Sequence, residues 1–377
     1  MNPNRSVDRC LLPAICNKIR ISFLLRFSIA VLMLLGILGS RSCHAFWAQG
    51  HHAIAVLAFE KLSPEDQAEL IRILKQHPRF EQDFKIPESI RGNQRAIDRW
   101  WIGVAGEWPD LIRGNETYDR PTWHYQLGAT LVIGDVDYPE DPGPLPEGAT
   151  LATQELYIVQ AIELCHKVFH DKTQSDADRA IALCWLTHLV ADAHQPCHAG
   201  SLYSEKAFPQ GDRGANAIPV KVEGQPNIKN LHAFWDSLLG AEATPESVDA
   251  RVIELAFAPS KMLYLDQELG VTADQAKATA DLIESIKRME KAAIWIRESR
   301  QIARAWVYRG ELITKVQQNE RGLVSKMPDS ILKEDSIHRS LKLIRLQAVK
   351  SAGRLASALT LAEESIDSGK PKAKSNR

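Results

Sequence analysis

The chain has 377 residues, which is enough to bury a substantial core in one large domain or in two. Its 46 Lys and Arg residues and 47 Asp and Glu residues leave a net charge of −1, which excludes binding of nucleic acid through a globally basic surface. A nucleic-acid substrate would have to be held by local groups and metal ions.

Residues 1–45 have the composition of a secretory signal peptide. A basic start is followed by a mostly apolar run over residues 27–39, and Cys43 and Ala45 are the small residues expected before a cut after Ala45. The apolar run is shorter than the roughly 18 residues of a membrane span, which makes an uncleaved anchor the weaker alternative. We therefore expect a secreted or periplasmic protein with no stable membrane association after cleavage.

Hydrophobic periodicity predicts an all-α domain with little strand. Helices are expected within residues 51–76 (two helices), 150–170, 176–194, 230–239, 272–316 and 330–361. The segments at 150–170 and 176–194 read as amphipathic, and the last two of the six segments are too long to be assumed unbroken.

The remaining segments read as loops or tails. Residues 77–150 are rich in Pro, Gly and aromatic residues and are predicted to be mostly loop, with a plain loop at 137–148. Residues 199–229 are turn-rich, with a short extended piece at 217–222. The polar tail at 365–377 is predicted to be disordered.

Three of the six cysteines, Cys165, Cys184 and Cys197, lie beyond the signal segment. Export permits a disulfide, but an odd number without a regular spacing identifies none. Cys197 stands next to His198 and could ligate a metal, although a buried apolar role is the commoner one for cysteine.

The stretch at 185–198 reads WLTHLVADAHQPCH and holds three potential zinc ligands. His188 and Asp192 are four positions apart, so on a helix they point from the same face. Pro196 ends the helix, and His198 can then return to the same cavity from another direction, as a tetrahedral site requires. A His and an Asp at this spacing more often form a hydrogen-bonded or solvated pair, so a metal site depends on ligands from elsewhere.

Other stretches supply candidates for the missing ligands. His232 and Asp236 repeat the four-residue spacing on a second predicted helix. Asp110 and His124 each lie beside a tryptophan in predicted loops, and His51 lies at the start of the first predicted helix.

The order and spacing of these motifs resemble those of the S1/P1 nucleases, secreted enzymes with three zinc ions that are related to bacterial zinc phospholipase C. The matching stretches are GH at 50–51, WPD at 108–110, WH at 123–124, HLVADAHQPCH at 188–198, GDRGAN at 211–216, NLHAFWD at 230–236 and AGRLA at 352–356. The resemblance implies a single compact multi-helix domain of the phospholipase C/P1 nuclease type over residues 46–364.

The resemblance also implies ligands for three Zn²⁺ ions. All are His or Asp side chains except the mature N-terminal residue, which ligates through its amino nitrogen and carbonyl oxygen. The first ion would take Asp110, His124, His188 and Asp192, the second His198, His232 and Asp236, and the third His51, the shared Asp192 and the N-terminal Phe46.

Phe46 becomes the N-terminus when Gly50-His51 is matched to the family's glycine and histidine, and the expected signal cleavage gives the same residue. The family usually begins with Trp, but backbone atoms do the ligation, so Phe can serve. A register that begins at Trp47 and uses His52 is the weaker alternative, because it needs a cut after the bulky Phe46.

Phosphate ester hydrolysis is the chemistry that the resemblance implies. A hydroxide bridging two zinc ions would attack phosphorus in line, while the third ion stabilises the leaving oxygen. Asp110 would orient or deprotonate the water. Arg113 matches a family position proposed to stabilise the transition state, which fits the affinity of guanidinium for phosphate oxygens; the other interpretation is a solvated loop cation.

Tyr125 occupies the family's stacking position, where an unpaired base of single-stranded nucleic acid would lie. Two positions later the family usually has an Asp that reads the base edge, and this chain has Leu127, so base preference stays open. His194 matches its motif but receives no metal, so we expect it to orient a ligand or to pack.

The expected function is a zinc nuclease and 3′-nucleotidase that cleaves single-stranded nucleic acid and 3′-nucleotides to 5′-phosphate products. A zinc phospholipase C-like enzyme is the close alternative, against which Asp236 argues, since those enzymes carry Glu there. A non-catalytic zinc-binding helical protein is the second alternative, and the presence of all nine ligand positions argues against it. The sequence predicts neither an oligomeric state nor a role for residues 272–330.

Overall fold

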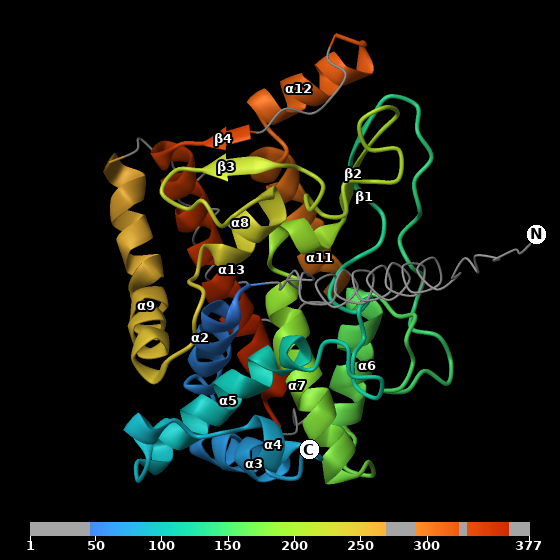
Figure 1. The fold of residues 1–377 in the computed structure, drawn as a ribbon. Helices are drawn as coiled ribbons and strands as arrows, with labels where there is room; N and C mark the ends of the chain where they lie inside the picture. The colour runs from blue at the N-terminus through green and yellow to red at the C-terminus, as the bar shows by residue number, and fades with distance from the viewer. Residues whose placement is uncertain (1–45, 269–291, 324–329, 362–377) are drawn as a thin grey trace, which may run out of the picture. The chain divides into compact units, whose positions relative to one another are not determined.

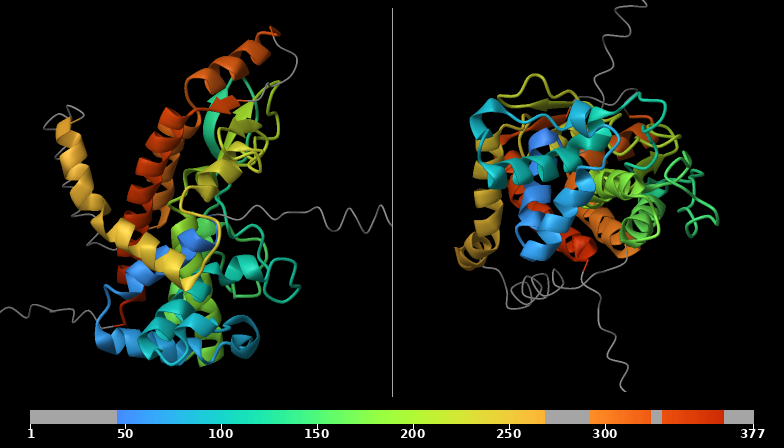
Figure 2. Two further views of the ribbon diagram at one scale, coloured as in Figure 1. Left: turned by 60° about the vertical axis from the view of Figure 1, so that its left-hand side comes forward. Right: turned by 90° about the horizontal axis from the view of Figure 1, so that it is seen from below.

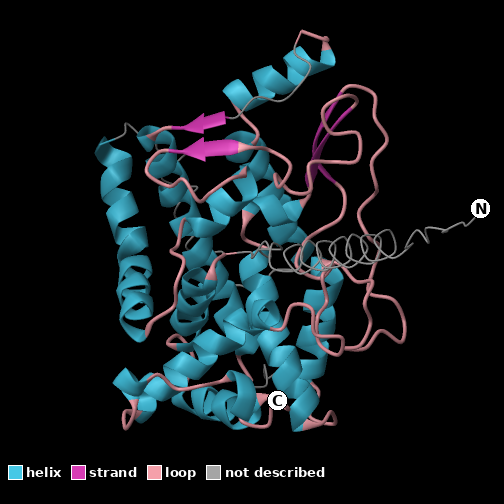
Figure 3. Ribbon diagram, in the orientation of Figure 1, coloured by secondary structure: helices cyan, strands magenta, loops and turns pink. Residues whose placement is uncertain are grey.

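The computed structural model describes residues 46–268, 292–323 and 330–361, all within one of the two units into which the chain divides, His44–Arg377 (Figure 1). The predicted signal peptide and disordered tail lie outside the described residues. The described part is mostly helical (Figure 3), which confirms the predicted all-α class. No described helix is both long enough and apolar enough to cross a membrane.

Most of the predicted helices are present. The longer helices are α2 (Ala48–Phe59), α3 (Pro64–Leu74), α5 (Gln94–Leu111), α6 (Ile158–His170), α7 (Asp176–Asp192), α9 (Pro245–Glu268), α11 (Ala292–Ile302), α12 (Glu311–Glu320) and α13 (Glu334–Leu359). The shorter ones are α4 (Phe80–Asp83), η1 (Glu88–Ile90), η2 (Pro196–Ala199), α8 (Leu231–Ser237) and the π-helical turn η3 (Ala303–Val307).

Two pairs of short parallel strands complete the described structure. The strands are β1 (Ala129–Ile133), β2 (Ser201–Ser204), β3 (Val220–Val222) and β4 (Ser330–Leu332), with β1 paired to β2 and β3 to β4. In the first pair Ala129 lies opposite Ser201 and Val132 opposite Tyr203. β1 and β2 follow the loop of His124 and the turn of His198, so this pair joins two segments that carry predicted ligands.

Helix α7 lies at the centre of the packing. It contacts α2, α3, α5, α6 and α13, and every residue from 182 to 192 is buried. Over residues 182–192 the predicted amphipathic character is therefore wrong, because neighbouring elements cover the whole circumference of the helix there rather than one face. α9 packs against α2 and α13 on the side away from α6 (Figures 1 and 2).

The loop prediction for residues 77–150 is wrong where α5 forms. Asn93 caps this helix, with its side chain accepting a hydrogen bond from the backbone of Ala96. Ile97, Trp101 and Trp108 recur at helical spacing and are buried, a signal that the Gly, Pro and Trp residues of the segment obscured. The predicted loop at 137–148 has no helix or strand.

Helix α6 begins later than its predicted start at residue 150. The side chain of Gln160 accepts a hydrogen bond from the backbone of Tyr157, which fixes the first turn of the helix there. In the segment at 272–316 the described helices α11 and α12 are separated by η3, and residues 272–291 lie outside the described part.

Two glycines bring α5 close to the helices that carry predicted ligands. A Cβ atom at Gly103 would lie 2.5 Å from Nδ1 of His52 on α2, and one at Gly106 would lie 3.1 Å from the carbonyl oxygen of His51. His52 cannot move aside freely, because it is buried against Trp100 and bonded to Glu107. The packing of α2 on α5 therefore requires these glycines.

We predict that Gly103→Ala destabilises the protein. Overpacking of a rigid site costs about 1–3 kcal/mol, and the better helix propensity of Ala returns only about 1 kcal/mol. The measurement is urea unfolding beside Gly143→Ala, where no atom lies within 4 Å of the new Cβ. Equal stability of the two variants would show that the contact between α2 and α5 does not depend on Gly103.

Candidate metal centre

The C-terminal half of α7 places the first two predicted ligands. Nε2 of His188 lies 3.1 Å from Oδ2 of Asp192, one helical turn away, and both side chains are fully buried. Helix α7 ends at Asp192, and Pro196 begins the separate turn η2 that carries His198. The predicted break at Pro196 is therefore confirmed.

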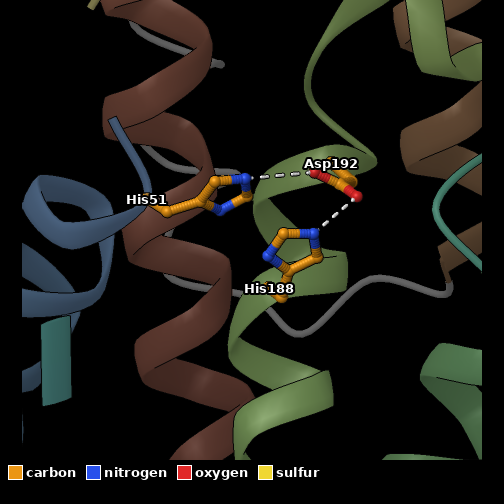
Figure 4. Close-up of side chains that lie close together, drawn as sticks. All are labelled: His51, His188 and Asp192. Carbon is orange, nitrogen blue, oxygen red and sulfur yellow. Dashed lines mark ion pairs between the residues drawn. The ribbon is translucent and has the colours of Figure 1, made fainter. Parts of the chain in front are cut away.

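The two oxygens of Asp192 face different histidines. Oδ1 lies 3.4 Å from Nε2 of His51, while Oδ2 lies 3.1 Å from Nε2 of His188 and 3.1 Å from Nδ1 of His124 (Figure 4 shows the His51 and His188 sides). The rings of His51 and His188 stack with centroids 4.0 Å apart. A carboxylate in this position can ligate one ion with each oxygen.

The second group is formed where α5, the loop after it and α7 meet. Nδ1 of His124 lies 2.9 Å from Nε2 of His188, and Oδ1 of Asp110 lies 3.9 Å from each of these nitrogens. Asp110 stands in the last turn of α5 rather than in the predicted loop. Trp185 packs edge-on against His124 at 5.3 Å and so forms an apolar wall beside the group.

The third group joins η2 to α8. Nε2 of His232 lies 3.2 Å from Oδ2 of Asp236 one turn along α8, and Nε2 of His198 lies 4.0 Å from Oδ1 of Asp236. The ligand atoms of His198, His232 and Asp236 all lie within 4.8 Å of one another, as do those of the two groups at Asp192 and Asp110. The structure thus brings together all eight predicted His and Asp ligands.

Backbone carbonyls fix the orientation of three of these histidines. Nδ1 of His188 bonds to the carbonyl of Gly106 at 2.7 Å, and Nδ1 of His232 bonds to that of Gly214 at 2.6 Å. Nδ1 of His198 bonds likewise to the carbonyl of His124. A carbonyl can only accept a hydrogen bond, so each Nδ1 carries the proton. Each Nε2 therefore keeps a lone pair that it can donate to a metal ion.

Sequence reasoning missed these orienting groups, although one of them has a local signal. Gly214 has a φ of 60°, and a Cβ there would lie 2.3 Å from the carbonyl oxygen of Cys197, so only glycine fits. This explains the last glycine of the GDRGAN motif. Gln195, also missed, donates to Oδ1 of Asp236 at 2.6 Å and holds that carboxylate toward the third group.

Burial makes the donor set suitable for a metal ion. It lowers the pKa of His124, His188 and His198, which keeps these imidazoles neutral, the form that ligates. It raises the pKa of Asp192 well above its usual value, because a buried carboxylate lacks solvation. Nε2 of His198 and Oδ2 of Asp236 are buried without a hydrogen-bond partner, so a cation would satisfy both.

Arg113 lies against Asp110 rather than free in solvent. Its Nε donates to Oδ1 of Asp110 at 2.9 Å and its terminal nitrogen lies 2.7 Å from the same oxygen. The guanidinium therefore stands at the rim of the Asp110 group, with 21% of the side chain exposed. From there it can orient the carboxylate and also reach a bound anion.

Phe46 and Trp47, the two alternatives for the N-terminal residue of the mature protein, both lie near the predicted metal ligands. Phe46 is fully buried and its ring meets that of His51 edge-on at 5.9 Å, while the backbone N–H of Trp47 donates to the carbonyl of Asp236 at 3.1 Å. His51 joins the Asp192 group, whereas His52 bonds to Glu107. This arrangement favours the register that uses His51.

The other predicted residues have simpler surroundings. Tyr125 is 41% exposed and meets Tyr157 edge-on at 5.9 Å, so part of its side chain is open to solvent. Cys197 is buried and belongs to none of the three groups, which fits the apolar role. His194 is fully buried and bonds to Arg354.

Comparison with known proteins shows which family the sequence matches. Endonuclease 2 of Arabidopsis thaliana is 24% identical over 277 residues, which cover 71% of this chain and 78% of that protein. The family model described as S1/P1 Nuclease, a metal-dependent family, matches residues 46–363. Because that match spans most of the sequence, the chain belongs to the S1/P1 nuclease family.

Proposed function

We propose that this nuclease is a zinc-dependent phosphoric ester hydrolase that cleaves single-stranded nucleic acid to 5′-phosphate products and 3′-nucleotides to nucleosides and inorganic phosphate. The observation that carries the proposal is the position of Asp192, whose two oxygens face different histidines, His51 on one side and His124 and His188 on the other. A carboxylate shared in this way supports adjacent ions, which suit the charge of a phosphate ester in hydrolysis. A structural zinc site, by contrast, is usually single and closed.

Zinc is the ion that best fits the donor atoms. The three groups offer only imidazole nitrogens and carboxylate oxygens, which are zinc ligands, and they are too poor in oxygen for calcium or magnesium. The assignment that follows uses three ions. As the family resemblance implies, Asp110, His124, His188 and Asp192 would hold the first, His198, His232 and Asp236 the second, and Phe46, His51 and Asp192 the third. The ligand atoms of His51, His188 and Asp192 lie close together, as do those of Asp110, His124 and His188 and those of His198, His232 and Asp236.

Bound zinc would activate water and neutralise charge on the phosphate oxygens. The side chains of this chain then have separate tasks. Asp110 can orient the water or accept its proton, and Arg113, which touches Asp110, can donate to a phosphate oxygen. Exposed Tyr125, next to His124, offers a ring on which an unpaired base can stack, which would favour single strands over duplexes.

Export and processing belong to the same proposal. Signal cleavage after residue 45 would make Phe46 the N-terminal residue of a secreted or periplasmic protein. The α-amine has an unperturbed pKa of about 7.7–8.0 and can be neutral, as ligation requires. The burial of Phe46 beside His51 supports this role.

We predict that Asp192→Asn lowers the number of bound zinc ions by at least one, because an amide cannot offer two anionic oxygens. The measurement is the zinc content per chain after exhaustive dialysis. Asp66→Asn is the matched control, since Asp66 is a buried carboxylate that belongs to none of the three groups. Equal zinc contents in the two variants would contradict the shared-ligand assignment.

We also predict the substrates. The purified protein should cleave single-stranded DNA and 3′-AMP, cleave duplex DNA more slowly, and leave phosphatidylcholine intact. A chelator should abolish the cleavage of DNA and of 3′-AMP. The readouts are the 5′-phosphate ends of the DNA products and the phosphate released from 3′-AMP. Cleavage of phosphatidylcholine alone would favour the phospholipase alternative, and no chelator-sensitive cleavage at all would favour the non-catalytic one.

A further inference from the structure

Arg300 of α11 binds the two chain segments that carry His124 and His198. The guanidinium donates from Nε to the carbonyl of Ala199 at 2.7 Å and from a terminal nitrogen to the carbonyl of Leu127 at 2.8 Å. Ala199 directly follows His198, and Leu127 comes three residues after His124. One side chain from a distant helix therefore bonds to both ligand segments, which belong to different metal groups.

These two carbonyls lie between the direct hydrogen bonds that join the segments. Toward the metal centre, the N–H of Gln126 donates to the carbonyl of His198 at 2.8 Å. Toward the strand pair, the N–H of Ser201 donates to the carbonyl of Gly128 at 3.1 Å. Arg300 supplies donors to the carbonyls between these points and so continues the connection from the strand pair to the ligands.

Two glycines provide the space that the guanidinium occupies. A Cβ at Gly128 would lie 2.8 Å from Oδ1 of Asp141 and 3.1 Å from a terminal nitrogen of Arg300. A Cβ at Gly200 would lie 2.8 Å from the carbonyl oxygen of Gly128 and 3.3 Å from Nε of Arg300. Both glycines have a positive φ, of 100° and 147°, so the backbone is shaped around this side chain.

Asp141 fixes the orientation of the guanidinium. Its two oxygens accept from both terminal nitrogens of Arg300, one of them at 2.6 Å, and Oδ1 is also 3.3 Å from Nε2 of Gln126. Only 14% of the Arg300 side chain is exposed. A bidentate pair of this kind restricts the plane of the guanidinium and therefore the directions of its remaining donors.

We propose that Arg300, oriented by Asp141, is a positioning residue that sets the separation between the metal group of His124 and that of His198. The proposal rests on the zinc centre proposed above. It also gives α11 a specific role, because this helix bonds through Arg300 to Ala199, the last residue of the turn η2, and through Ser299 to Ala193, which precedes the turn. A misplacement of about 1 Å between catalytic groups is enough to lower the activity of a site.

Zinc affinity is the readout that tests this role, and it does not depend on hydrolysis. We predict that Arg300→Met weakens zinc binding by roughly 10- to 100-fold, the usual effect of removing a group that orients metal ligands. Asp141→Asn should have a smaller effect in the same direction, because an amide can still accept one bond. Arg297→Met is the matched control, since Arg297 is an exposed cation on the same helix.

The experiment is competition between the purified zinc-loaded protein and a chelator, with circular dichroism of the metal-free forms as the check on folding. The zinc affinity of Arg300→Lys, which keeps the charge and one donor, should lie between that of the wild type and that of Arg300→Met. If Arg300→Met does not fold, the comparison is made with Arg300→Lys alone. Zinc affinity in Arg300→Met and Arg300→Lys equal to that of Arg297→Met would overturn the proposal. A wild-type protein that binds no zinc would instead overturn the proposed function.

Discussion

The burial of the Asp192 carboxylate is the constraint on which the site depends. This side chain has no exposure to water, and burial raises its pKa well above the usual value. The imidazoles around it cannot compensate as cations, because burial lowers the pKa of His124 and His188. Cations on both sides of the carboxylate would remove this penalty, which is why the cluster suits a metal centre.

The surrounding fold holds this cluster by close backbone approach. Gly106 and Gly214 supply the carbonyls that orient His188 and His232, and both glycines stand where a Cβ would meet another segment. Helices α2, α3, α5, α6 and α13 all pack against α7. The C-terminal half of α7, which carries His188 and Asp192, therefore cannot shift to relieve crowding. The close packing therefore restricts the positions that the ligand side chains can take, as a catalytic site requires.

The sequence predicted the parts of this site that depend on local spacing. The pairs at 188/192 and 232/236 follow from the helical repeat, and the separate approach of His198 follows from Pro196. The sequence did not predict that Asp110 lies on a helix, because the glycines and tryptophans of α5 resemble a loop in composition. Nor did it predict the carbonyl partners or the Arg300–Asp141 pair, because these contacts join segments that are 18 to 159 positions apart in the chain. Such contacts depend on tertiary packing, and of the carbonyl partners Gly214 alone has a local signal, the last glycine of the GDRGAN motif.

The most direct test of the proposed three-ion centre is anomalous X-ray scattering at the zinc edge from crystals of protein that begins at Phe46. The account predicts three peaks, two of them on opposite oxygens of Asp192 and one of these two beside the amino group of Phe46. The third peak should lie among His198, His232 and Asp236. A single peak, or peaks that do not contact Asp192, would contradict it.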